Sequence, residues 1–106
     1  MYELLHSLGV TANYIGFFHS AFAVCLALQN PNRLLLVTKW LYPEVAKHYS
    51  TSWHCVERNI RTVSKHAWTR NRLLLESLAS RILPNPPSAS DFLAILTSYL
   101  ISLRAA

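Results

Sequence analysis

The stretch STSWHCVERNIRTVSKHAW, Ser50–Trp68, contains the clearest structural pattern in the sequence. Apolar residues recur in it at alternating intervals of three and four, which places their side chains along one side of an α-helix. The pattern therefore predicts an amphipathic helix of about 17 residues that packs its apolar stripe on a core. The stripe is Trp53, Val56, Ile60, Val63 and Ala67, and the opposite side carries His54, Glu57, Arg58, Arg61 and Lys65.

The sequence on both sides of this stretch predicts further helices. Alternation of apolar and polar residues, the signature of a half-buried strand, never extends beyond a few residues. Proline is tolerated in the first turn of a helix, so Pro43 divides one helical run into two. We therefore expect an all-α fold of about six helices. The expected segments besides the amphipathic helix are Tyr2–Leu8, Tyr14–Leu28, Leu34–Trp40, Tyr42–Tyr49, Thr69–Leu83 and a last helix that begins near Ser88.

The composition is that of one compact domain with a local basic surface. The chain has 106 residues, enough for a single core, and only 14% of them are charged, against roughly 25% in an average globular protein. The net charge is +5, and the segment Lys39–Arg81 carries all of it, with eight basic and three acidic residues (8 − 3 = +5). A basic surface attracts polyanions such as nucleic acid, although it also serves solubility alone.

Cysteine usage and hydropathy point to the cytoplasm. Cys25 and Cys55 are the only cysteines and follow no pattern of pairs, which is typical of a reduced protein. The most apolar stretch, Tyr14–Leu28, is too short to span a bilayer and is interrupted by polar residues. No lysine or arginine precedes it, as a signal peptide would require. We expect a cytoplasmic protein that does not enter a membrane.

The sequence gives no indication of catalysis. None of its five histidines is accompanied by a Ser–His–acid order, a glycine-rich phosphate loop or a pair of carboxylates at working spacing. A zinc site built from His54, Cys55 and His66 fails because neighbouring helix residues point about 100° apart and no second ligand pair exists. We expect neither an enzyme nor a cofactor or metal site.

The segment 42–68 has the order of a helix-turn-helix motif, which is a short helix, a polar break and a longer helix with basic side chains. The start of the second helix would enter the major groove, where arginine reads guanine and glutamate accepts from cytosine N4. Side chains further along would meet phosphates, as would hydroxyls and free amides at the helix N-terminus. The candidate base contacts are His54, Cys55, Glu57 and Arg58, and the candidate phosphate contacts are Ser50, Thr51, Ser52, Arg61 and Lys65. The alternative is a surface helix in which Glu57 and Arg61 form an ordinary ion pair one turn apart.

Short sequence words then indicate a family. The words "TK..LYP..AK", "VER.IR" and "AW" within Val37–Trp68, "H.LGV.A...G" from His6 to Gly16, and "P.S.DF" near the last helix cover nearly the whole chain. Together they resemble the C-terminal effector domain of the master transcription factor of sporulation initiation in endospore-forming bacteria.

The resemblance implies an all-helical domain that binds a promoter box of double-stranded DNA, often as tandem copies. It assigns base reading to Glu57 and Arg58, phosphate contacts to Arg61 and Lys39, and a place near the DNA backbone to His6. In that family the region after the recognition helix contacts the polymerase sigma subunit.

Three departures from the family pattern bear on the function that we expect of this chain. Cys55 stands where the family has a basic, base-reading residue, and the region after Trp68 is several residues shorter. A chain of 106 residues that begins at Met1 also leaves no room for the family's receiver domain, so we expect either an excised domain or a free-standing effector domain. The expected function is sequence-specific transcriptional regulation. The alternatives are an interaction module that pairs with a full-length regulator or polymerase without reading DNA, and a nonspecific nucleic-acid binder.

Overall fold

The structure, a computed structural model, describes residues 1–105, and within them it contains helices and no strand. This confirms the predicted all-α class. None of the helices in this range combines the length and the hydropathy needed to cross a membrane. The elements are α1 (Tyr2–Ser7), α2 (Ile15–Gln29), the 3-10 helix η1 (Pro31–Leu35), α3 (Val37–Trp40), α4 (Tyr42–His48), α5 (Trp53–Ala79) and α6 (Ala89–Ala105).

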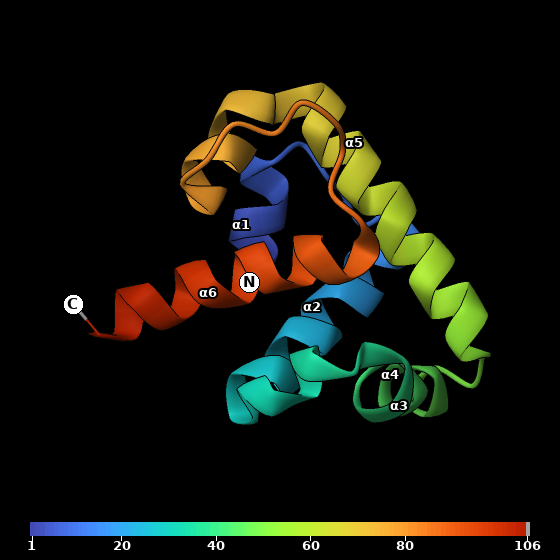
Figure 1. Cartoon of the computed structure of the whole chain (residues 1–106). Coiled ribbons are helices and arrows are strands. Elements are labelled where there is room, and N and C mark those ends of the chain that lie inside the picture. The colour runs from blue at the N-terminus through green and yellow to red at the C-terminus, as the bar shows by residue number, and fades with distance from the viewer. Residues whose placement is uncertain (106) are drawn as a thin grey trace.

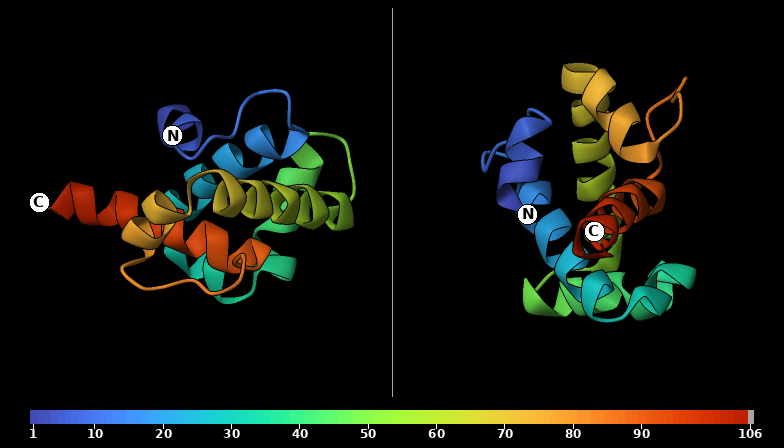
Figure 2. Two further views of the ribbon diagram at one scale, coloured as in Figure 1. Left: turned by 90° about the horizontal axis from the view of Figure 1, so that it is seen from above. Right: turned by 90° about the vertical axis from the view of Figure 1, so that its left-hand side faces the viewer.

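Three long helices, α2, α5 and α6, pack against one another in pairs and form the centre of the molecule (Figure 1). The short helices α3 and α4 lie together beside the N-terminal end of α5, and a loop returns from the end of α5 to the start of α6. Figure 2 shows that the C-terminal end of α6 projects beyond the other helices. The side of α5 that faces away from α2 and α6 is left open.

The apolar stripe of α5 supplies much of the core, as the sequence predicts. Val56, Ile60, Val63 and Ala67 have no exposed surface, whereas Trp53 is half-buried. Burying each of the larger side chains contributes about 1.5–3 kcal/mol relative to leaving it exposed. Because the stripe is buried, the charged side of the same helix must face outward. The stripe packs among core residues of the other helices, which include Leu5, Leu8, Phe17, Val24, Val45, Phe92, Leu93 and Leu96.

The helices α2 and α5 approach each other closely at Gly16. A Cβ atom added there would lie 2.6 Å from Cγ2 of Val63 and closer still to the backbone carbonyl oxygen of Asn59. Three residues further along α2, Nδ1 of the buried His19 lies 3.5 Å from the Asn59 side-chain amide nitrogen. Burial lowers the pKa of His19, so its imidazole stays neutral and can accept this bond. Glycine is therefore required for the two helix backbones to meet.

The predicted division into two helices, 53–68 and 69–83, is confirmed, although the break lies at Asn71 and the second helix ends at Ala79. The label α5 covers both helical segments, which meet at a kink where Asn71 is non-helical (φ −149°, ψ 66°). The Asn71 Oδ1 accepts from the Leu74 backbone N–H at 3.3 Å, as a helix N-cap does, and its Nδ2 donates to the Ser7 carbonyl at 2.9 Å. The kink thus has its cause in a contact with the end of α1.

The expected helix over Leu34–Trp40 also differs from the structure. A 3-10 turn occupies 31–35, and α3 begins only at Val37, because Leu36 adopts a non-helical conformation (φ −150°, ψ 77°). The turn starts early because Pro31 fixes its own φ and the Asn30 side chain accepts from the Asn32 backbone N–H at 3.2 Å. The leucines 34–36 therefore do not share one helical face.

The Gly16 contact leads to a stability prediction. Changing Gly16 to Ala places a methyl group against the Asn59 backbone, which cannot yield as a side-chain end would. We expect the free energy of unfolding to fall by about 3 kcal/mol, at the upper end of overpacking costs, in urea denaturation followed by circular dichroism.

Ser20→Ala is the matched control on the same helix. The Ser20 hydroxyl is buried without a hydrogen-bond partner among the described residues, so its removal should leave stability unchanged or raise it. Equal stability of Gly16→Ala and the wild type would contradict the close approach.

Candidate nucleic-acid interface

The helices α4 and α5 are joined by a tight turn that the local sequence specifies. Pro43 lies in the first turn of α4, where its missing N–H costs nothing. After α4, Ser50 takes a left-handed conformation (φ 53°), and the Thr51 backbone N–H donates to the Ala46 carbonyl at 2.9 Å. Tyr42, Val45 and Ala46 are buried, so α4 is held on the core while the turn stays in solvent.

Ser52 is the N-cap of α5. Its hydroxyl oxygen accepts from the Cys55 backbone N–H at 3.2 Å, while Ser50, Thr51 and Ser52 are all exposed. The remaining free amides of the first turn point toward solvent, beyond the N-terminal end of the helix. Such a terminus attracts anions through its unsatisfied N–H groups and the helix dipole. The structure therefore places the three predicted turn residues together at one accessible helix start.

The outward side of α5 carries the predicted charged residues. His54, Arg58, Arg61 and Lys65 are exposed, and Glu57 is partly buried. The Glu57 carboxylate accepts two bonds from Nη1 of Arg61, at 2.9 and 3.1 Å. This is the ion pair that the sequence offered as an alternative to base reading. Its presence holds Glu57 and Arg61 close to each other on the surface of the free protein.

Glu57 also affects a buried neighbour on α4. Burial raises the pKa of Tyr42 to about 12, and the negative charge of Glu57 contributes to the rise. The Tyr42 hydroxyl therefore stays protonated at any physiological pH. Arg58 is bound less tightly than Glu57, since among residues 1–105 its side chain makes a single hydrogen-bond contact, from Nη2 to the Cys55 sulfur at 3.7 Å. Its guanidinium is free to turn outward.

Cys55 and His54 have distinct surroundings. Hydrogen bonds from the Ser52 and Thr51 side chains lower the pKa of the Cys55 thiol, and the positive charge of Arg58 adds to this effect. The thiolate is therefore present at lower pH than in an isolated cysteine. The His54 ring stacks on the Trp53 indole, with ring centres 3.8 Å apart. This stacking holds the imidazole beside the start of α5.

The two phosphate contacts that come only from the family resemblance lie on other elements. Lys39 is exposed at the end of α3, next to α4, with its Nζ 6.0 Å from the centre of the Trp40 ring. His6 is exposed on α1, and its ring stacks on Phe17. The end of α1 contacts Asn71, which is 14 residues or about 20 Å along α5 from Glu57. His6 therefore does not join the residues at the start of α5.

A shallow pocket of about 280 Å³ adds residues that the sequence did not suggest. Tyr14, Thr62, Lys65, His66 and Thr69 line it. His66 joins the N-terminal loop to α5, since its Nδ1 lies 3.2 Å from the Tyr14 hydroxyl and its Nε2 lies 3.0 Å from the Gly9 carbonyl oxygen. The helical spacing of Thr62, Lys65 and Thr69 could have indicated a shared face, whereas Tyr14 comes from a distant loop. The pocket puts three hydroxyl groups around one lysine.

The described part of the chain contains no cluster of three or more histidine, cysteine, aspartate or glutamate side chains that could hold a metal ion. The interface is thus a basic helix face with a polar N-terminal turn. Its chemistry is that of hydrogen bonding and charge, the means by which proteins bind nucleic acid.

Comparison with known families agrees with this chemistry. The family model described as Sporulation initiation factor Spo0A C terminal matches residues 1–100, nearly the whole chain. Domains of this family contain a helix-turn-helix motif, bind DNA and regulate transcription, and are not enzymes. The match confirms the resemblance inferred from the sequence, and with it the DNA-binding, non-enzymatic character of this chain.

The N-cap of α5 links helix stability to thiol reactivity. Changing Ser52 to Ala removes the acceptor for the Cys55 backbone N–H and should cost about 1 kcal/mol in the free energy of unfolding. It also removes the leading cause of the lowered Cys55 pKa, so the pH–rate profile of Cys55 alkylation by iodoacetamide should shift to higher pH.

Ser88→Ala is the control, because the Ser88 hydroxyl accepts from the Asp91 backbone N–H at 3.2 Å at the start of α6. It should cost a similar free energy and leave the Cys55 profile where it is. An unshifted profile in Ser52→Ala would refute the proposed origin of the low thiol pKa.

Proposed function

The chain belongs to the family of Spo0A C-terminal domains, and from this premise we propose that it recognises a promoter box through the start of α5. In this proposal the segment 42–68 is the helix-turn-helix unit, and Glu57 and Arg58 read bases in the major groove. The observation that carries it is a basic helix face, exposed along its length, that begins at an accessible N-terminal turn. Such a face supplies both attraction to the duplex and side chains that reach base edges.

Arg58 is the principal base-reading residue of the proposal. Its guanidinium is exposed and has only the weak contact with the Cys55 sulfur to give up. A guanidinium can donate two parallel hydrogen bonds to O6 and N7 of guanine. Glu57 can accept from cytosine N4 on the neighbouring base pair. Its ion pair with Arg61 holds the carboxylate in place. Breaking the pair costs little free energy, because an exposed ion pair of this kind contributes at most about 1 kcal/mol.

The phosphate contacts surround this reading pair. The hydroxyls of the Ser50–Ser52 turn and the free amides of α5 donate hydrogen bonds to one DNA phosphate. Arg61 and Lys65 bind other phosphates along the helix. Tyr14 lines the pocket beside Lys65 and offers a hydroxyl there, whereas the Thr62 and Thr69 hydroxyls already donate to the Arg58 and Lys65 carbonyls. Lys39 extends the contacts from α3, and His6 lies near the backbone at the far end of α5. Phosphate contacts of this kind fix the orientation of the protein on the duplex.

Cys55 replaces the basic, base-reading residue of the family, and this replacement favours a different DNA target sequence. A thiol carries no guanidinium fork and no positive charge, so the base pair that faces it is read weakly, with His54 beside it as a further donor. We propose that the box bound by this chain differs at that base pair from the box of relatives with a basic residue there.

The remaining parts of the proposal concern the molecular context. Residues 1–106 form one effector unit. It acts in the cytoplasm, where promoter DNA lies, and it can bind adjacent boxes as tandem copies or a homodimer. The residues after Trp68 are the segment that would meet the polymerase sigma subunit, and there the chain forms the kinked second half of α5. The shorter sequence weakens that contact.

A second candidate function is an interaction module that pairs with a full-length regulator or with polymerase and reads no sequence. The Glu57–Arg61 pair and Cys55 are the observations that favour it, since both reduce the number of groups available to bases. A module of this kind would keep the fold and lose the preference for one duplex.

The test compares two variants on two duplexes. One duplex carries the box obtained by selection from a randomised library, the other is scrambled, and each is titrated at two salt concentrations. Arg58→Ala should weaken binding to the selected box by about 1–3 kcal/mol and relax its sequence preference. Lys65→Ala should weaken binding to both duplexes alike and reduce the salt dependence of affinity.

Arg104→Ala, at the exposed end of α6, is the matched control for loss of one positive charge. If selection yields no preferred box, or if Arg58→Ala leaves the preference intact, the base-reading assignment fails and the interaction module becomes the better account.

A further inference from the structure

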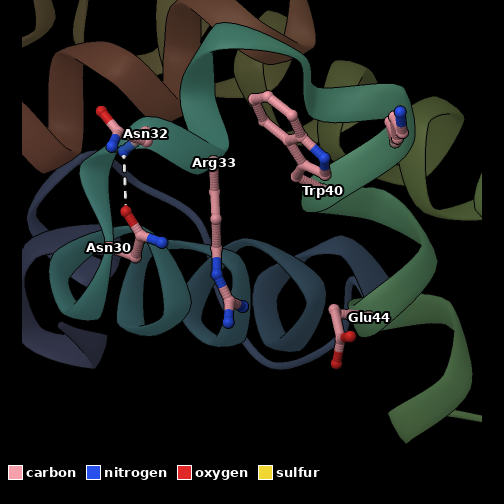
Figure 3. Close-up of a pocket in the computed structure, with 6 residues that line it drawn as sticks. Asn30, Asn32, Arg33, Trp40 and Glu44 are labelled. Carbon is pink, nitrogen blue, oxygen red and sulfur yellow. Dashed lines mark hydrogen bonds between the residues drawn. The ribbon is translucent and has the colours of Figure 1, made fainter.

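An open pocket of about 390 Å³ lies between η1, α3 and the start of α4 (Figure 3). We call it the Arg33 groove. Figure 3 shows Arg33 and two asparagines on one side of it, and Trp40 and Glu44 on the other. None of these residues belongs to α5, and although Glu44 lies on α4 and Lys39 is a proposed phosphate contact, the DNA-binding proposal gives no role to Asn30, Asn32, Arg33 and Trp40. Its lining residues are Asn30, Asn32, Arg33, Lys39, Trp40 and Glu44.

Arg33 has an unmet hydrogen-bonding requirement. Its Nη1 is buried and has no hydrogen-bond partner among the described residues. A buried donor without an acceptor costs free energy, and the cost is greater for a charged group. Glu44 lines the same groove but makes no ion pair with Arg33 within the described part of the chain. The group that best satisfies a guanidinium is a carboxylate, which can accept two parallel bonds from it.

Apolar surface adjoins this cation. Trp40, which lines the groove, is 45% exposed, and Leu35 and Leu36, which follow Arg33 by two and three residues outside the lining, are 76% and 44% exposed. Lys39 adds a second positive charge beside the Trp40 ring. Exposed apolar residues that gather around a few polar groups are typical of protein interaction sites, where tryptophan and arginine contribute most of the binding energy.

We propose that the Arg33 groove docks an acidic, apolar peptide segment of a partner protein. A carboxylate of the segment pairs with Arg33, and its apolar side chains cover Leu35, Leu36 and Trp40. Charge complementarity favours this occupant, because the groove has two cations and one acid. Glu44 also disfavours a nucleic-acid backbone, whose successive phosphates would meet its carboxylate, whereas a peptide can donate a backbone N–H to it.

The experiment is a selection from a random 12-residue peptide library displayed on phage, with the immobilised chain as target. We expect the selected peptides to be enriched in aspartate or glutamate next to leucine or aromatic residues. Arg33→Gln should lower the affinity of the chain for the best synthetic peptide at least tenfold, which corresponds to about 1.4 kcal/mol of binding free energy. Leu35→Ser should weaken it as well, and because this side chain is exposed the variant retains the fold. In ¹⁵N spectra of the wild type, the peptide should shift the Trp40 indole N–H signal.

Arg81→Gln is the matched control, since it removes one exposed positive charge outside the groove and should leave peptide affinity unchanged. The proposal is overturned if no peptide is selected, if the selected peptides lack acidic residues, or if Arg33→Gln binds as tightly as the wild type. If Arg33→Gln instead weakens promoter binding as much as Lys65→Ala does, the groove is part of the DNA interface. Self-association that is lost in Leu35→Ser would assign it to a second copy of the chain.

Discussion

The close approach of α2 to α5 at Gly16 is the constraint on which the rest of the structure depends. The two helix backbones meet where Gly16 faces the Asn59 carbonyl and the Val63 side chain. Because α5 carries a buried stripe and an exposed basic side, any shift of this crossing would rotate or lift the basic side as well. The His19–Asn59 contact lies next to the crossing and limits such a rotation. The position of Arg58 in solvent is therefore determined from inside the molecule, by a residue without a side chain.

The region around the kink in α5 is held by the N-terminal segment as well as by its own buried leucines, Leu75 and Leu78. Asn71 donates to Ser7, His66 binds the Gly9 carbonyl and the Tyr14 hydroxyl, and Gly9 lets the chain pass close to Arg70 with a positive φ of 87°. These contacts bend α5 and bring Tyr14 beside Lys65. They explain how a loop far away in the sequence becomes part of the basic face. The kink also sets the direction of the residues after Trp68, the region that separates this chain from the family pattern.

Features that depend on spacing within one helix could be predicted from the sequence, whereas contacts between distant segments could not. The amphipathic pattern of 53–68 was enough to predict the helix, its buried stripe and its exposed charges, because all three depend on spacing within one helix. The family words were enough to predict DNA binding. A helix boundary after Trp68 was predicted, but its position at Asn71 was not, since only the contacts with the Ser7 carbonyl and the Leu74 N–H make this side chain the cap. The separation of His6 from Glu57 depends on the same contact between α1 and the kink. The residue-by-residue roles at the DNA remain predictions.

The charges on α5 show how a helix with two acids can still serve a polyanion. Glu57 and Glu76 each pair with an arginine one turn away, Arg61 and Arg72, which leaves Arg58, Lys65 and Arg70 as the cations of the helix outside ion pairs in the described part of the chain. The two ion pairs differ in how easily the glutamate and the arginine can separate. Glu76 also accepts from the Leu83 backbone N–H at 2.7 Å, the main cause of its lowered pKa, so its pair is tied to the chain reversal after α5. Glu57 has no such backbone bond. Arg61 is 58% exposed, so exchanging its partner for a phosphate costs little, and the exchange would free the Glu57 carboxylate for a base. The Glu57–Arg61 ion pair is therefore compatible with DNA recognition, because the proposed phosphate contact of Arg61 would replace the ion pair at little cost.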